Sequence, residues 1–129
     1  MFTAEGLITR NSPCSVPQTL DRLETVLLSK GITIFARVDH SGEATKAGLS
    51  MPPTQLLIFG NPKGGTQVML ANPLSAIDLP LKALAWQDAG AVFLSWTDPQ
   101  FLRQRFSLSQ QVMPPIEALS GLIEKALAP

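Results

Sequence analysis

The chain has 129 residues, of which 45% are hydrophobic and 16% charged, a composition typical of one globular domain, residues 1–129, without stabilising metals. Ten basic residues balance ten acidic ones, which disfavours nucleic-acid binding, and no apolar run reaches the roughly 18 residues of a membrane span. One cysteine and the absence of a signal-peptide pattern predict a cytoplasmic protein, and the low charge suggests apolar surface buried in an oligomer.

The N-terminal part predicts a strand followed by a helix. Residues 2–10 alternate loosely between apolar and polar side chains, and residues 11–13 break the pattern. Ser15 has the spacing to Gln18 of a helix capping box, and Gly31 is a typical helix end. Apolar side chains of the helix form one stripe, made of Val16, Leu20, Leu23 and Leu27.

A second strand is predicted over residues 32–38, with one strongly apolar face made of Ile32, Ile34, Ala36 and Val38. A short helix over residues 41–48 follows, with Ser41 as its cap and Gly48 as its end. The next strand, residues 56–59, is apolar on both faces, so we expect a central strand covered on both sides.

The strand over residues 56–59 leads into a loop, residues 60–66, and Thr66 opens a short helix that ends before Asn72-Pro73. Residues 74–80 are expected to be irregular.

Strands 81–86 and 92–96 form a hairpin whose turn places Gly90 at a positive φ angle. Asp98 caps a short helix, and a last helix spans about residues 112–128, with an apolar stripe of Ile116, Leu119, Ile123 and Ala126.

These elements predict an α+β fold with two layers. The sheet would have about five mostly antiparallel strands, and the helices would pack on one face of it. The expected order is strand, helix, four strands, helix. The sequence has no internal repeat, low-complexity tract or linker.

Three blocks of the chain resemble the bacterial domain-of-unknown-function family 302. They are Arg37-Val38-Asp39-His40, Phe59-Gly60-Asn61-Pro62 with Gly65-Thr66, and Ile77-Asp78-Leu79-Pro80-Leu81-Lys82 with Trp86-Gln87-Asp88. The resemblance covers residues 6–106. It implies a fold similar to the TATA-box-binding-protein domain, often as a dimer, and no known activity.

The segment from Gly60 to Thr66 is the best candidate for a ligand site. Its two glycines have the spacing of a phosphate-binding P-loop, but Thr66 stands where that motif requires lysine, which disfavours nucleotide hydrolysis. Backbone N–H groups and Lys63 could still bind a small anion. The alternative is a structural turn in which Asn61 bonds the backbone and Thr66 caps the helix.

Asp39 and His40 form a second candidate, a catalytic dyad, because an adjacent carboxylate can raise the pKa of a histidine. The alternative is that Asp39 only caps the following helix. A metal site is not predicted, since one histidine and one cysteine do not make a ligand set.

Asp78 and Lys82 form a third candidate. A lysine on a mostly apolar strand suggests a nearby carboxylate or ligand. Pairing of Lys82 with Asp78, Asp88 or Asp39 is the structural interpretation, and a desolvated nucleophilic lysine is the functional one.

The sequence therefore suggests a non-catalytic domain that binds a small ligand or anion, acts as a homodimer and uses no cofactor. The alternatives are a small enzyme with His40 or Lys82 as acid/base, and a structural or partner-binding module without a pocket. The candidate binding residues lie at strand ends and in Gly/Pro segments: Asp39, His40, Asn61, Lys63, Thr66, Asp78 and Lys82.

Overall fold

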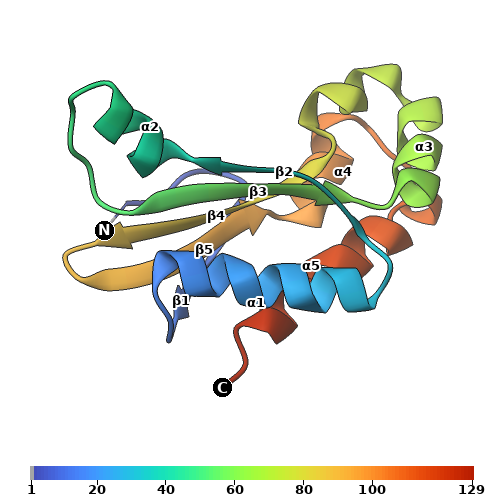
Figure 1. Cartoon of the computed structure of the whole chain (residues 1–129). Coiled ribbons are helices and arrows are strands. Elements are labelled where there is room, and N and C mark those ends of the chain that lie inside the picture. The colour runs from blue at the N-terminus through green and yellow to red at the C-terminus, as the bar shows by residue number, and fades with distance from the viewer. Residues whose placement is uncertain (1) are drawn as a thin grey trace.

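The computed structural model describes residues 2–129 and contains a five-stranded antiparallel sheet with the order β1-β5-β4-β3-β2 (Figure 1). The strands are β1 (Leu7–Ser12), β2 (Thr33–Asp39), β3 (Thr54–Gly60), β4 (Leu81–Asp88) and β5 (Ala91–Thr97). The helices are α1 (Val16–Ser29), α2 (His40–Lys46), α3 (Pro62–Ala71), α4 (Pro99–Arg105) and α5 (Pro114–Ala126), with 3-10 turns η1 (Pro73–Asp78) and η2 (Gln110–Val112). The α+β class is confirmed, and short helices separate some of the expected four strands.

Helices α1 and α5 lie together against one face of the sheet (Figure 1). The apolar stripes predicted for both helices are buried there, since their side chains form the core with the facing strand residues. Burial of each such side chain contributes roughly 1.5–3 kcal/mol. The core includes Leu20, Leu23, Leu27, Leu119 and Ile123 from the helices and Leu57, Phe59, Ala83, Ala85, Leu94 and Trp96 from the strands.

Several helix caps and one turn that the sequence predicted are confirmed. Ser15 caps α1 in a complete capping box with Gln18. Asp98 caps α4 by accepting a hydrogen bond from the N–H of Gln100. The β4–β5 hairpin turns through Ala89 and Gly90, whose φ angles are 49° and 83°, as expected of a tight two-residue turn.

An extra residue interrupts the pairing of the edge strand β2 with β3. Ile34 pairs with Phe59 and Ala36 pairs with the next residue of β3, Ile58, so that Phe35 has no partner. The irregularity is a β-bulge. Such a bulge reverses the faces to which the following side chains point.

The predicted apolar face of β2 is therefore wrong beyond Ile34. Ala36 and Val38 lie on the far side of the sheet from α1, and Arg37, which pairs with the buried Leu57, lies on the covered side. A strict alternation from the sequence could not reveal this reversal, because the bulge depends on the pairing with β3.

Arg37 ties β2 to α1. Its Nη1 atom lies 2.7 Å from Asp21 Oδ1 and 2.6 Å from Glu24 Oε2, and its Nη2 atom donates to the carbonyl oxygen of Pro17 at 2.9 Å. Burial acts to lower the pKa of Arg37, but the hydrogen bonds and charges of Asp21 and Glu24 outweigh it and raise the pKa. The guanidinium group thus bonds to three oxygen atoms of α1, two from carboxylates and one from the backbone.

No helix crosses the centre of the other face of the sheet within residues 2–129 (Figure 1). Trp86 stacks on Phe93 there, with 4.7 Å between the ring centroids, and its Nε1–H donates to Ser95 Oγ at 2.9 Å. We call this surface the open sheet face and define it by Leu56, Ile58, Leu84, Trp86 and Phe93.

The expectation that the strand at residues 56–59 is covered on both sides is wrong. Leu57 and Phe59 are fully buried under the helices, whereas Leu56 and Ile58 are only half-buried on the open sheet face. An apolar run on both faces thus does not mean that both faces are covered within one chain.

Helix α3 begins at Pro62, earlier than the predicted start at Thr66. Asn61 Oδ1 accepts a hydrogen bond from the N–H of Lys63 at 3.1 Å, and proline suits the first helical position. The expected loop is therefore a helical turn. The Asn-Pro start outweighs the low helix propensity of Gly64 and Gly65.

Two further boundaries differ from the prediction. The first strand is Leu7–Ser12 rather than residues 2–10, because it pairs with β5 as far as Ser12. Helix α2 begins at His40 with Asp39 as its cap, and not with Ser41. The stretch expected to be irregular, residues 74–80, overlaps the 3-10 turn η1.

We expect Gly64→Ala to destabilise the protein by about 1–3 kcal/mol, because a Cβ at Gly64 would lie 2.5 Å from the Cβ of Pro115 on α5. Gly65→Ala is the matched control. A Cβ there meets nothing within 4 Å, so the better helix propensity of alanine should leave stability unchanged or raise it by up to about 1 kcal/mol. Urea denaturation measures both, and equal effects would contradict the close packing of α3 on α5.

Candidate functional site

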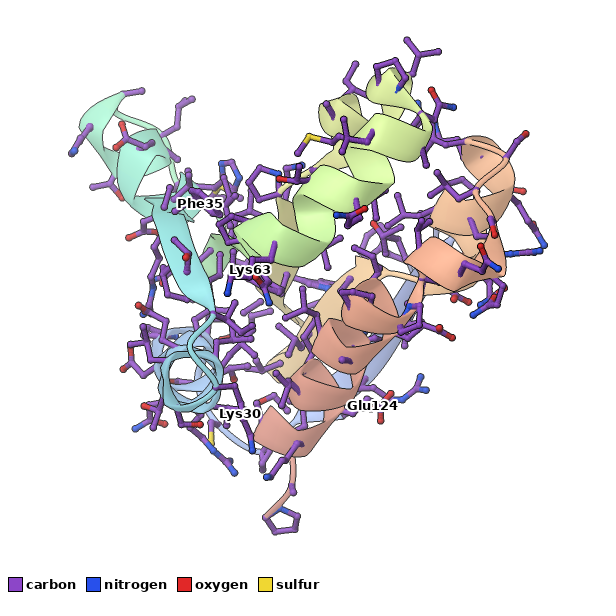
Figure 2. The ribbon with its side chains drawn as sticks, turned by 90° about the vertical axis from the view of Figure 1, so that its right-hand side faces the viewer. Lys30, Phe35, Lys63 and Glu124 are labelled. Carbon is purple, nitrogen blue, oxygen red and sulfur yellow. The ribbon has the colours of Figure 1, made fainter. Side chains whose placement is uncertain are left out.

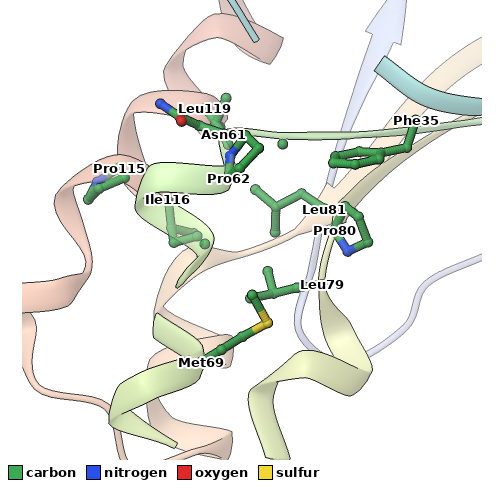
Figure 3. A pocket seen from close by; sticks show the side chains of 12 residues that line it. Phe35, Asn61, Pro62, Met69, Leu79, Pro80, Leu81, Pro115, Ile116 and Leu119 are labelled. Atoms are coloured by element: carbon green, nitrogen blue, oxygen red, sulfur yellow. The ribbon is translucent and has the colours of Figure 1, made fainter. Parts of the chain in front are cut away.

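A cavity of about 130 Å³ lies where the end of β3 meets α3 and α5 (Figure 3). Because Phe35 and Asn61 are exposed, it reaches the surface beside them. Figure 2 views the molecule from this end and labels Phe35 on β2 and Lys63 on α3. The cavity is lined by Phe35, Gly60, Asn61, Pro62, Gly65, Met69, Leu79, Pro80, Leu81, Pro115, Ile116 and Leu119.

The lining of the cavity is apolar. Asn61 provides its only polar side chain, and no charged or histidine side chain belongs to it. The Oδ1 atom of Asn61 already accepts the N–H of Lys63, and within residues 2–129 its amide group donates to no protein acceptor. Protein interiors are normally close-packed, so an apolar space of this size is a candidate for a small ligand.

Asn61 lies at the mouth of the cavity, whereas Lys63 and Thr66 are exposed on the first turns of α3 and do not line it. The Oγ1–H of Thr66 donates to the carbonyl oxygen of Pro62 at 2.6 Å, so Thr66 is not a helix cap. The N–H of Gly65 donates to the carbonyl oxygen of Asn61 at 2.8 Å. These helical bonds leave no P-loop-like cradle of backbone N–H groups.

Asp39 and His40 lie at the opposite end of β2. Asp39 pairs with Gln55 at the start of β3, whereas Thr33 pairs with Gly60 at its end; the two ends are roughly 20 Å apart at the usual rise per residue. Asp39 caps α2, and His40 is exposed as the first residue of that helix. The capping interpretation of Asp39 is therefore confirmed.

The carboxylate of Asp39 is held by two donors. It accepts the Oγ–H of Ser41 at 2.7 Å and the N–H of Gly42 at 2.9 Å. These two hydrogen bonds lower the pKa of Asp39 below its ordinary value of 3.8. The bonds explain why aspartate suits this position without any reference to a ligand.

Asp78 and Lys82 lie near each other, but the ion-pair partner of Asp78 is Arg105. The Arg105 Nη1 atom lies 2.8 Å from Asp78 Oδ2. Lys82 pairs in register with Ile58 and is exposed, and in the described part of the chain it forms no ion pair. Both residues line a second hollow of about 140 Å³ together with Arg105.

The three blocks noted in the sequence thus do not all meet in space. Asn61 shares the cavity with Leu79, Pro80 and Leu81, which separate Asp78 from Lys82. His40 and Lys82 are offset by three or more residues along β3, since Asp39 pairs with Gln55 and Lys82 with Ile58. This placement therefore gives little support to the alternative of a small enzyme that has His40 and Lys82 in one site.

Sequence reasoning missed most of the cavity because its lining is apolar. Phe35 and Met69 looked like ordinary strand and helix positions, and Leu119 looked like part of a buried stripe. One signal was available: three lining prolines, at 62, 80 and 115, lie within the two candidate blocks and at the start of the last helix.

A family model described as "Domain of unknown function DUF302" matches residues 8–126. The crystal structure of an uncharacterized conserved DUF302 protein from Bacillus stearothermophilus resembles this fold with a TM-score of 0.79, covering 96% of this chain and 97% of that one. The two sequences are 20% identical, so this likeness concerns the fold alone.

Curated relatives are found in Brucella. The proteins named "Fluoride-specific ion channel FluC 1" of Brucella suis and Brucella abortus are each 44% identical to this chain over 127 residues, or 95% of it. The match covers 50% and 47% of those proteins, so this chain spans about half of their length. Among residues 2–129, no helix is both long and apolar enough to cross a membrane.

We expect Asp39→Ala to lower the thermal unfolding midpoint near neutral pH, because α2 loses its cap. The folded-state pKa of Asp39 is lowered, so the stabilisation is full above its ordinary pKa of 3.8 and is lost as the pH falls through the folded-state value. The difference between wild type and variant should therefore shrink in acid. Asp39→Asn, which keeps a capping oxygen, should lie close to wild type at neutral pH; a large loss with both substitutions would contradict the capping role.

Proposed function

The chain belongs to the DUF302 family of domains of unknown function, and on that premise we propose that it is a non-catalytic domain that binds a small ligand and acts as a homodimer. The cavity at Gly60 and Asn61 is the observation that carries this proposal. Its position beside two of the three sequence blocks supports a ligand site there, and its presence weighs against a module without a pocket.

The proposed site is mounted on rigid elements. Its walls come from strand ends and from the close contact of α3 with α5, where Gly64 touches Pro115. Prolines at three positions of the lining restrict the backbone further. A preformed site of this kind loses little conformational entropy when a ligand binds.

The open sheet face supports the homodimer. Five strands of about seven residues present roughly 500 Å² of surface per copy at the usual strand spacing and rise, close to the lower limit of a specific interface. Its aromatic centre, Trp86 and Phe93, is typical of interface cores. A shallow hollow on the same face, lined by Phe2, Leu84 and Trp86 among others, leaves room for a partner's side chains.

The channel activity named for the Brucella proteins is not part of the proposal. This chain corresponds to about half of each of those proteins, and within residues 2–129 no helix is long and apolar enough to cross a membrane. We propose instead that the matched half of those relatives carries a ligand-binding domain of the present kind.

Native mass spectrometry tests the ligand site. We expect the purified wild-type chain of 13.9 kDa to carry extra mass, and Gly60→Ala to lose it. A Cβ at Gly60 would lie 3.6 Å from Pro80 Cβ and 3.7 Å from Phe35 Cε2, so the methyl group fits but takes up space in the cavity. A group of this size can weaken binding about tenfold or more.

Gly121→Ala is the matched control for that experiment, because a Cβ there meets nothing within 4 Å and the residue does not line the cavity. Benzene added to the wild-type protein should also shift the amide NMR signals of Gly60 and Gly65. Equal ligand retention by both variants would contradict the site, as would a wild-type protein with neither extra mass nor a response to benzene.

Sedimentation velocity tests the homodimer. We expect wild-type protein to sediment as a dimer and Leu84→Glu to sediment as a monomer, because a dimer through the open sheet face would have to bury the new charge. Leu28→Glu is the control, since Leu28 is 59% exposed on α1, away from that face. A monomeric wild type, or dissociation by both variants, would refute the proposed interface.

A further inference from the structure

We infer that the ligand of the cavity is a compact, uncharged apolar molecule or group of about six carbon atoms, and that Phe35 limits its size. The inference rests on the proposed ligand-binding function. It adds the chemical class of the ligand and the residue that selects it.

The volume of the cavity indicates the size of the group that it can enclose. At about 130 Å³, the space is slightly smaller than an apolar cavity of about 150 Å³ that stays dry and binds benzene in another protein. A single aromatic ring or a branched chain of similar volume would fill it. A fused pair of rings exceeds this volume, so it would either displace a wall or extend past Phe35 at the mouth.

The lining excludes a charged ligand. A carboxylate or ammonium group loses its hydration on entering an apolar cavity and requires a partner of opposite charge there. None of the twelve lining residues is charged. Lys63 is exposed outside the lining, and Arg105 is paired with Asp78. Asn61 can hydrogen-bond one neutral polar atom at the mouth, such as a hydroxyl oxygen.

Phe35 is brought to the mouth by the bulge in β2. It is the extra residue between the pairs Ile34–Phe59 and Ala36–Ile58, on a strand at the edge of the sheet. Bulges redirect the side chain of the inserted residue. The ring is 52% exposed and nevertheless lines the cavity (Figure 3), so it forms a wall that a neighbouring strand does not hold in place.

Gly60 completes the same part of the wall. A Cβ on this residue would touch both Phe35 and Pro80, at 3.7 Å and 3.6 Å. The missing side chain therefore leaves the space between the aromatic ring and the proline open. Shortening Phe35 would widen this space without altering the core, because Phe35 is not among the buried core residues.

Titration calorimetry with benzene, naphthalene and benzoate tests the inference on wild type, Phe35→Ala and Phe2→Ala. The wild type should bind benzene at least about tenfold more tightly than naphthalene or benzoate. Phe35→Ala should gain about tenfold or more in naphthalene affinity, because one wall is removed. Phe2→Ala should match wild type, since Phe2 is 70% exposed and contacts Trp86 on the open sheet face.

Two outcomes overturn the inference while leaving the proposed function in place. Benzoate binding as tightly as benzene would refute the uncharged class, and an unchanged preference for benzene in Phe35→Ala would refute the role of Phe35. Retention of a native ligand by the wild type, with no binding of benzene or naphthalene, would refute the stated class alone. Failure of all three compounds together with a ligand-free native mass spectrum would overturn both the inference and the proposed function.

Discussion

The bulge in β2 is the constraint on which much of this structure depends. One extra residue, Phe35, lies between two consecutive pairs with β3 and reverses the faces of the residues that follow. Arg37 consequently reaches the carboxylates of α1 and fixes that helix to the edge strand. Phe35 itself is directed to the mouth of the cavity. A single local irregularity therefore connects the attachment of a core helix with the wall of the candidate site.

Packing between helices shapes the rest of that site. Gly64 allows α3 to approach Pro115 on α5 more closely than any side chain would permit. Gly60 and Gly65, by contrast, each have room for a Cβ atom and line the cavity without filling it. Close contact at one glycine and open space at the others together leave an apolar hollow that reaches the surface beside Phe35 and Asn61. The atoms that line such a hollow lose dispersion contacts, which a bound apolar ligand would restore.

The two faces of the sheet differ in what covers them. The covered face holds the core under α1 and α5, and the cavity lies at the end of this layer. The open sheet face carries half-buried apolar and aromatic side chains that no helix of residues 2–129 covers at its centre. The shared fold of a solved structure with 20% identity shows that this architecture tolerates wide changes in sequence.

The sequence by itself determined the features that depend on near neighbours along the chain. The cap at Ser15, the turn at Gly90 and the buried stripes of α1 and α5 follow from local hydrogen bonding and helical period. It also directed attention to Gly60 and Asn61, although as an anion-binding loop. Only the tertiary structure decided the bulge, the early start of α3 and the open sheet face, because pairing with β3 and contact with α5 set them. The cavity belongs to this second group, since its mostly apolar walls come from four separate segments and apolar residues carry no chemical signature in a sequence.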